Sequence, residues 1–529
     1  MAQILSNQGE YPGNKSMIEA FEAIFKRQPD ARKVNIPSGY TYFGQFIIHD
    51  ISSIDGTNRH APKDLPWEND KKDDYWATVC NLHEPDFNLE SIYGRPADLN
   101  SEPVDSSSEL PFLRVGSTAP SGGPRQTSSL SYPCDLPRKP NSYEVEIPDA
   151  RNDENVVLAQ THLAFIKFHN VLVMKLSERP EYQDDGKFKR KELFDKAREL
   201  NIRYYQRIIL DDFLPRVVQT DDLIWAAHNL NSDRLHYQPY TDSFIPVEFA
   251  VAAFRFGHSM IRSKYEINAF FREDESDPAL LPATLDQLQT FTGASKMNNN
   301  PSGSLPSEWI IDWNRFYQLD NTKKNFAQTI NTTLPKELLE LQPLIVDTTK
   351  GRANSIAALD LFRSRQFRLS SGQAIAHSMH VARLPAYRIR KAINIKSVDK
   401  SITKEKRLQI KRDLIAQFST NSPLWYYILL EAQSEETRQL GPVGGRLVAQ
   451  TICQLIYNSK ISVLRDPVKN GDEFLLDGRF SMPEMLRRIR NARLDESLPT
   501  YPPNTQRFDE TNPLGNGLIQ MQTEEIDNN

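Results

Sequence analysis

Residues 148–170 read PDARNDENVVLAQTHLAFIKFHN, a charged start followed by a long apolar run. Apolar residues recur through this run at spacings near three and four, which predicts a long buried helix. Asn152 or Asp153 could cap that helix, and acidic residues there suit its dipole. Because capping requires no arginine, Arg151 and Glu154, three residues apart, could instead project toward one site as a fixed cation and a carboxylate.

Other segments show the same helical periodicity. They cover residues 191–213, with Pro215 marking the end, and residues 248–261, 402–418 and 443–457. The segment 101–142 is rich in Ser, Pro and Gly and predicts a long loop without regular structure. Since alternating strand patterns are few and no repeat occurs, we expect a mainly α fold with little sheet. It would comprise an N-terminal arm (1–35), one large helical domain (36–500) and a polar, flexible tail (501–529).

Composition excludes several classes of function. The 529 residues include 64 Lys plus Arg against 69 Asp plus Glu, a net charge of -5, which argues against nucleic acid as a partner. The three cysteines, Cys80, Cys134 and Cys453, form neither a disulfide framework nor a zinc pattern. We see no secretory signal and no apolar run long enough to span a bilayer, so we expect no membrane insertion. The expected location is the cytoplasm, or outside the cell after export without a cleaved N-terminal signal.

Residues 44–50, GQFIIHD, hold the first pair of candidate site residues. In a helix, Gln45 and His49 share one face at i and i+4, while Asp50 points about 100° away. Two polar groups would then face one pocket and the carboxylate would serve another site. Taken alone, the segment equally describes a buried, hydrogen-bonded histidine with a surface aspartate.

Two further segments carry titratable residues. Residues 254–261, FRFGHSMI, place His258 on an apolar helix beside Gly257, which removes a side chain where a flat macrocycle could approach. Residues 359–366, LDLFRSRQ, supply an acid and two cations. Alone, His258 could be a satisfied core histidine, and the second segment a surface helix with ion pairs.

In combination, GQFIIHD, the 148–170 stretch, FRFGHSMI, LFRSR and LGPVGGRLVAQTI (440–452) are more specific. Their order and approximate spacing across residues 36–495 resemble the animal-type haem peroxidases of the peroxidase-cyclooxygenase superfamily, especially the bacterial members. The resemblance implies haem b as cofactor and hydrogen peroxide as substrate. It also implies that small electron donors are oxidised through a ferryl haem intermediate. A role in the response to oxidative stress is expected as well.

The resemblance assigns roles on the peroxide side of the haem. His49 would be the distal acid/base, which takes a proton from peroxide and returns it to the leaving oxygen. Arg151 would stabilise the negative charge that develops as the oxygen-oxygen bond breaks. Gln45 matches the residue that hydrogen-bonds water or halide above the iron.

On the opposite face, His258 would be the iron ligand. Asp360 matches the residue that hydrogen-bonds this histidine, usually asparagine in the family. An ionised carboxylate there would push electron density to iron and lower its potential. Arg255 and Arg363 resemble residues that hold the haem propionates.

Three positions concern covalent links to the haem. Ile48 replaces an aspartate that often forms an ester, whereas Glu154 matches the second ester-forming carboxylate, so at most one ester is expected. Asn155 replaces the methionine that adds a sulfonium link in one mammalian branch. Without that electron-withdrawing group, we expect iodide, thiocyanate, bromide or phenols to be better donors than chloride.

Asp50 matches a calcium ligand in the family. The loop before Tyr93-Gly94 offers further oxygen donors at alternating positions, namely Asp86, Asn88 and Glu90. Asn88 and Glu90 depart from the commoner aspartate and serine. A solvated acidic loop is the alternative interpretation.

Two rival functions fit the same resemblance. A haem-dependent fatty-acid dioxygenase would need a tyrosine three positions before the proximal histidine, where this chain has Arg255. A non-enzymatic adhesion or scaffold protein on the same fold would be expected to have lost His49, Arg151 or His258. All three are present, which favours an enzyme.

Overall fold

The computed structural model describes most of the chain between residues 26 and 492. The described ranges are 26–27, 36–53, 81, 83–94, 104–120, 131–140, 142, 144–184, 186–228, 245–293, 303–319, 325–340, 355–393, 403–435, 438–466 and 479–492. The expected tail, nearly all of the expected arm, and Cys80 lie outside these ranges.

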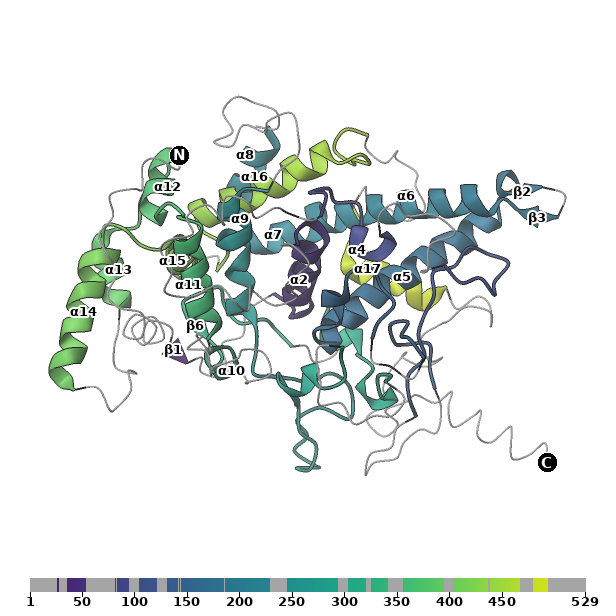
Figure 1. Ribbon diagram of the computed structural model, residues 1–529, viewed down its shortest axis with the longest axis horizontal. Helices are drawn as coiled ribbons and strands as arrows, with labels where there is room; N and C mark the ends of the chain where they lie inside the picture. The colour runs from purple at the N-terminus through teal and green to yellow at the C-terminus, as the bar shows by residue number, and fades with distance from the viewer. Residues whose placement is uncertain are drawn as a thin grey trace.

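The described fold is mainly helical, as the sequence predicts (Figure 1). The α-helices are α2 (Gly39–Ile51), α4 (Glu90–Tyr93), α5 (Val156–Ser177), α6 (Arg190–Ile208), α7 (Leu214–Val217), α8 (Thr220–His228), α9 (Val247–Val251), α10 (Lys336–Leu339), α11 (Ile356–Gln366), α12 (Gly372–Ser378), α13 (Ala386–Ala392), α14 (Lys404–Phe418), α15 (Leu424–Ser434), α16 (Pro442–Asn458) and α17 (Met482–Asn491). Short 3₁₀ segments are η2 (Ala150–Asp153), η3 (Pro180–Tyr182), η5 (Ala253–Met260), η6 (Gln287–Gln289), η7 (Ser307–Trp309) and η8 (Trp313–Arg315), and η4 (Ile209–Phe213) is a π-helix.

Sheet is confined to two-residue strands in the described part of the chain. β1 (Lys26–Arg27) runs parallel to β6 (Thr333–Leu334), β2 (Gln183–Asp184) pairs antiparallel with β3 (Lys187–Phe188), and β4 (Lys264–Tyr265) pairs antiparallel with β5 (Ala283–Thr284). In the described parts of 101–142, only isolated bridges occur, which confirms the expected loop.

Helix α5 forms the centre of the core. It packs against α2, α6 and α17, and its Phe165 stacks on Phe46 of α2 with ring centroids 4.9 Å apart. Contrary to our expectation, α5 is long and apolar enough to span a membrane. Its apolar stretch is nevertheless entirely buried inside the protein, which is typical of a core helix.

Helix α2 lies near the middle of the molecule (Figure 1), with α5 and α6 extending to one side and α11 to α15 grouped on the other. It packs both against α5 and against η5, so residues 44–50 and 254–261 are brought together although about 200 positions separate them. This contact positions the candidate site.

Three local predictions were wrong. Asn155, rather than Asn152 or Asp153, caps α5, because its side chain accepts a hydrogen bond from the Leu158 backbone N–H at 2.9 Å. Pro215 does not end the helical path, because the wider π turn of η4 precedes it and it falls in the first turn of α7, where its missing N–H costs little.

The predicted helix over residues 248–261 is instead two elements, α9 and η5. Ala252 separates them with φ -129° and ψ -65°, outside the helical region. The tighter 3₁₀ segment that follows carries His258.

Candidate active site

Helix α2 presents one partly open face. Gly44, Gln45 and Ile48 are its only positions that are not buried, and they lie on one side at i, i+1 and i+4. His49 borders this face with 8% of its surface exposed, whereas Asp50 is fully buried. The structure thus confirms that Asp50 points away from Gln45 and His49.

The His49 ring is bonded on one nitrogen. Its Nδ1 lies 2.9 Å from Oδ1 of Asn152, and Nε2 has no hydrogen-bond partner among the residues that the structure describes. Burial, reinforced by the positive charge of Arg151, lowers the pKa of His49 to about 4. The ring is therefore neutral near pH 7, as a general base must be.

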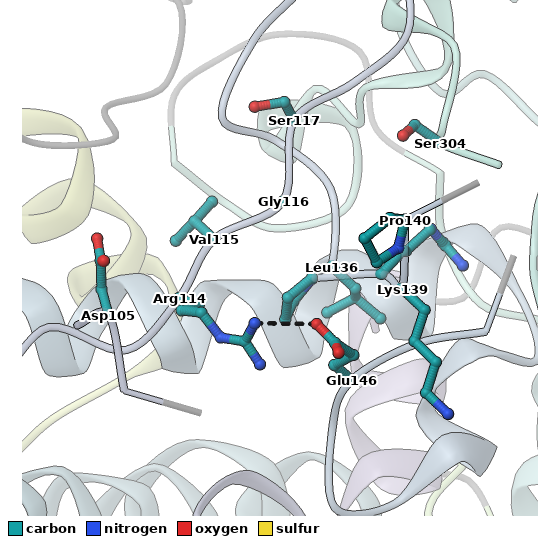
Figure 2. Close-up of a pocket in the computed structure, with 12 residues that line it drawn as sticks. Asp105, Arg114, Val115, Gly116, Ser117, Leu136, Lys139, Pro140, Glu146 and Ser304 are labelled. Atoms are coloured by element: carbon teal, nitrogen blue, oxygen red, sulfur yellow. Dashed lines mark hydrogen bonds and ion pairs between the residues drawn. The ribbon is translucent and has the colours of Figure 1, made fainter. Parts of the chain in front are cut away.

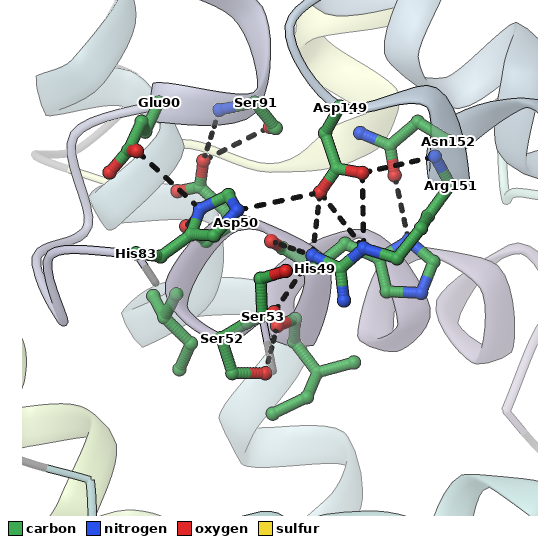
Figure 3. Close-up of polar contacts among 12 residues, drawn as sticks. His49, Asp50, Ser52, Ser53, His83, Glu90, Ser91, Asp149, Arg151 and Asn152 are labelled. Carbon is green, nitrogen blue, oxygen red and sulfur yellow. Dashed lines mark hydrogen bonds and ion pairs between the residues drawn. The ribbon is translucent and has the colours of Figure 1, made fainter. Parts of the chain in front are cut away.

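Arg151 lies against the last turn of α2 (Figure 3). Its Nη2 donates to the backbone oxygens of His49 (2.9 Å) and Ser52 (2.8 Å), and to Oδ2 of Asp149 (2.6 Å). Although burial alone would raise the pKa of the Asp149 carboxyl, these contacts hold it below its usual value. The structure brings Arg151 to His49 but compensates its charge with Asp149, a partner that the sequence analysis missed.

Gln45, Glu154 and Asn155 form a cluster at the open face. Gln45 Nε2 donates to Glu154 Oε2 at 3.1 Å, and Asn155 Nδ2 donates to Gln45 Oε1 at 3.2 Å. Burial raises the pKa of Glu154 to about 7, so a fraction of this carboxyl is protonated near neutral pH. The two residues that the sequence analysis assigned to halide binding and ester formation are thus in direct contact.

On η5, His258 is bonded to Asp360 of α11. Its Nδ1 lies 2.7 Å from Asp360 Oδ2, and Arg255 Nη1 donates to the other carboxylate oxygen at 2.8 Å. Burial alone would raise the pKa of Asp360, but His258 and Arg255 hold it below its usual value. The Nε2 of His258 has no hydrogen-bond partner in the described ranges, so it is available as a ligand.

The residues around His258 fit a flat, anionic cofactor. Apart from its chain neighbours, no described heavy atom lies within 4 Å of where a Cβ on Gly257 would sit. The positive charge of Arg255, together with burial, lowers the pKa of Arg363 to about 10, so two guanidinium groups lie close enough to repel each other. Carboxylates such as haem propionates would relieve that repulsion. The expected haem therefore fits these residues.

The candidate calcium residues form a less complete arrangement. The Asp50 carboxylate accepts hydrogen bonds from the backbone N–H groups of Leu89 (3.2 Å) and Ser91 (3.1 Å) and from the Ser91 hydroxyl (3.0 Å). Among the described residues, no three His, Cys, Asp or Glu side chains gather as metal ligands, so Asp50, Asp86 and Glu90 are not brought together. Oδ1 of Asn88, however, is buried and has no hydrogen-bond partner among the residues that the structure describes.

Sequence reasoning missed the contact that links Asn152 to His162. Asn152 Nδ2 lies 3.0 Å from Nδ1 of His162, in the second turn of α5. His162 belongs to the same motif, but its position on an apolar helix gave no signal apart from its being a polar residue among apolar ones. Only packing shows that it reaches Asn152.

A separate pocket of about 440 Å³ is lined by loops that precede η2 and by Ser304 (Figure 2). Arg114 and Glu146 both line this pocket and form an ion pair, with 2.9 Å between Nη1 and Oε2. Neither His49 nor His258 lines it, so this pocket is distinct from the candidate active site.

Residues 88–371 match the family model described as animal haem peroxidase. A peroxidase-like protein of Margaritifera margaritifera is 29% identical over 355 residues, which cover 56% of this chain and 39% of that protein. Human lactoperoxidase is 30% identical over 191 residues, covering 36% of this chain and 22% of that protein. The chain thus spans less than half the length of these curated relatives.

Among solved structures, the fatty acid alpha-dioxygenase of Oryza sativa is similar in fold. The TM-score is 0.52 at 11% identity, and the match covers 91% of this chain and 79% of that one. At this identity the likeness concerns the fold alone.

Proposed function

Because the chain belongs to the animal haem peroxidase family, we propose that it reduces hydrogen peroxide and oxidises small electron donors at a haem b held between α2 and η5. The observation that carries the proposal is the arrangement of two histidines. His49 and His258 come from two elements that pack together. Each is bonded through Nδ1, and each leaves Nε2 without a hydrogen-bond partner among the described residues.

Haem, when bound, supplies an iron that binds peroxide and stores the oxidising equivalents for the donor. His258 would hold this iron through Nε2, while Asp360 fixes the ring through Nδ1. Arg255 and Arg363 would hold the propionates, and Gly257 leaves room for the macrocycle. These assignments agree with the chemistry of each side chain, since imidazole is a common haem iron ligand and guanidinium groups pair with carboxylates.

The chain's own groups would carry out the proton transfers. His49 Nε2 would take the proton of hydrogen peroxide and return it to the oxygen that leaves as water. Because Asp149 and two backbone oxygens hold Arg151 at the last turn of α2, its charge is fixed beside the site. A fixed cation lowers the energy of a transition state in which negative charge develops on oxygen.

The donor would be a small anion or a phenol. Iodide, thiocyanate, bromide and phenols are favoured over chloride, because Asn155 stands where a sulfonium link would otherwise withdraw electrons from the haem. Gln45 would hydrogen-bond the water or halide above the iron, since its amide lies on the open face of α2.

The direct test is spectroscopic and kinetic. The purified protein loaded with haem should show a Soret band and turn over iodide or guaiacol with hydrogen peroxide. His49→Ala should keep the Soret band and lose turnover by about 10²-fold or more. His377→Ala is a matched control, because His377 lies exposed on α12, and it should retain turnover. Turnover in His49→Ala equal to that of the wild type would contradict the proposal.

The two rivals give different results in the same preparation. A fatty-acid dioxygenase would consume oxygen with an unsaturated fatty acid, and the fold is shared with such enzymes. The position where that chemistry needs a tyrosine is occupied by Arg255, whose guanidinium is paired with Asp360. A scaffold protein would show neither oxygen uptake nor peroxide turnover.

Calcium and the likeness to bacterial members stay predictions from the resemblance. Oδ1 of Asn88, which is buried and has no partner among the described residues, supports a cation in the loop whose Leu89 bonds Asp50, because amide oxygens are suitable calcium ligands. A calcium-dependent shift in melting temperature that Asn88→Leu abolishes would support this site.

A further inference from the structure

One side-chain amide connects the candidate base, His49, to a second buried histidine, His162. Asn152 of η2 places Oδ1 2.9 Å from His49 Nδ1 and Nδ2 3.0 Å from His162 Nδ1. The exposed fractions of His49, Asn152 and His162 are 8%, 0% and 0%. The contact between Asn152 and His49 is drawn in Figure 3.

The chemistry of the amide restricts where the ring protons lie. Its oxygen only accepts hydrogen bonds and its nitrogen only donates them. With Oδ1 toward His49 and Nδ2 toward His162, His49 must carry its proton on Nδ1 and His162 must leave Nδ1 unprotonated. Both rings are buried, which favours the neutral form with one N–H on each ring.

This arrangement leaves the lone pair of His49 on Nε2. That nitrogen is the one without a hydrogen-bond partner in the described part of the chain, and it belongs to the ring that borders the open face of α2. A ring with the opposite tautomer would present an N–H there and could not accept a proton.

We propose that Asn152, held by His162, is a positioning residue that fixes the tautomer of His49 and so keeps Nε2 available as the proton acceptor. The inference rests on the proposed function for its purpose, but it can be tested without peroxide turnover. Hydrogen cyanide binds ferric haem as the anion, so its proton must also pass to a nearby base.

The experiment measures the association rate of cyanide with the haem-loaded full chain, followed by the Soret shift. Asn152→Leu removes both hydrogen bonds at similar volume and should slow association by about tenfold or more. Asn152→Asp keeps an acceptor toward His49 Nδ1 and should restore a rate near that of the wild type. His162→Phe leaves Asn152 in place without the acceptor that orients its amide, and should also slow association.

Asn170→Leu is the matched control. Asn170 is also buried, at 2% exposed, and bonds the backbone N–H and C=O of Leu113 through its amide. Its loss should destabilise the fold while leaving the cyanide rate unchanged, which separates a structural loss from the loss of a proton acceptor.

Wild-type rates in both Asn152→Leu and His162→Phe would overturn the inference. So would an Asn152→Asp variant as slow as Asn152→Leu, because an acceptor toward His49 Nδ1 would then not be enough to maintain the rate. Failure of the proposed function would give a different result: the wild-type protein would bind haem and cyanide but would not react with hydrogen peroxide. The variant comparison still decides the role of Asn152 in that case.

Discussion

Asp360 Oδ2 lies 2.7 Å from His258 Nδ1, so the candidate iron ligand is bonded to a carboxylate rather than to an amide. The same carboxylate accepts a hydrogen bond from Arg255 at 2.8 Å through its other oxygen. Asp360 is fully buried, and its pKa lies below the usual value, so it is ionised at neutral pH. Its charge is shared between the two partners, which moderates the electron donation to His258 that the sequence alone implies.

The first prediction concerns the potential of the bound haem. Asp360→Asn removes the negative charge behind His258, so the reduction potential of the iron should rise, by tens of millivolts, in a spectroelectrochemical titration. Asp222→Asn is the control, because Asp222 is likewise buried and paired with an arginine, Arg446. An unchanged potential in Asp360→Asn would count against a charged proximal pair.

The second prediction concerns donor preference. With Asn155 where a sulfonium link would otherwise form, steady-state turnover at pH 7 should be faster with iodide, thiocyanate or bromide than with chloride. The structure gives Asn155 two other roles, as the cap of α5 and as a donor to Gln45. Strong chloride oxidation at neutral pH would refute this prediction.

The third prediction concerns covalent attachment. Burial raises the pKa of Glu154 to about 7, and Gln45 holds its carboxyl at the open face of α2. After treatment with hydrogen peroxide, acid-acetone extraction should leave haem with the wild-type protein but release it from Glu154→Gln. Glu431→Gln alters another buried glutamate, whose pKa burial raises to about 8, and should behave as the wild type does. Free haem from the wild type would argue against the ester.

The fourth prediction concerns the stability of the segment that carries Arg151 and Asn152. Arg138 is bonded to Asp135 (2.9 Å) and Asp153 (2.7 Å), and all three side chains are at most 5% exposed. Arg138→Met would leave two buried carboxylates without their cation, and should lower the free energy of unfolding by about 3–5 kcal/mol in a denaturant titration.

The neighbouring residue Lys139 provides the control. It pairs with Glu144, but both side chains are more than half exposed (51% and 55%). Lys139→Met should therefore change the free energy of unfolding by less than about 1 kcal/mol. Equal effects of the two substitutions would show that the buried ion pairs do not stabilise this segment.

The fifth prediction concerns pH. Burial, the charge of Arg151 and a smaller effect of His83 lower the pKa of His49 to about 4, while Asp149 opposes them. Because the neutral ring is the base and prevails above this pKa, the rate of reaction with peroxide should stay level from pH 7 to about 5 and fall near pH 4. Asp149→Asn removes the negative charge that favours protonation, so the midpoint should move lower. A midpoint near 6.5 in the wild type would contradict the burial of His49.

Several of the longer helices could be predicted from sequence because helical periodicity is local. The ranges 402–418 and 443–457 differ from α14 and α16 by two residues or fewer at each end. The failures came where local conformation depended on neighbours. A π turn carried the helical path past Pro215, and Ala252 divided the helix expected around His258.

The sequence by itself predicted which side chains would carry the proposed chemistry, because His49, Arg151, His258 and Asp360 belong to short motifs that resemble those of the family. It also determined that Asp50 faces away from Gln45, since helical geometry settles this within seven residues.

Only the tertiary structure decided the partners of these residues. Arg151 is compensated by Asp149, Asp360 is shared between His258 and Arg255, and Asn152 lies between two imidazoles. Apart from Asp149, these contacts join elements that are distant in sequence or belong to different helices. They form because burial removes water, so each desolvated polar group must find its hydrogen-bond partner among whichever neighbours the packing provides.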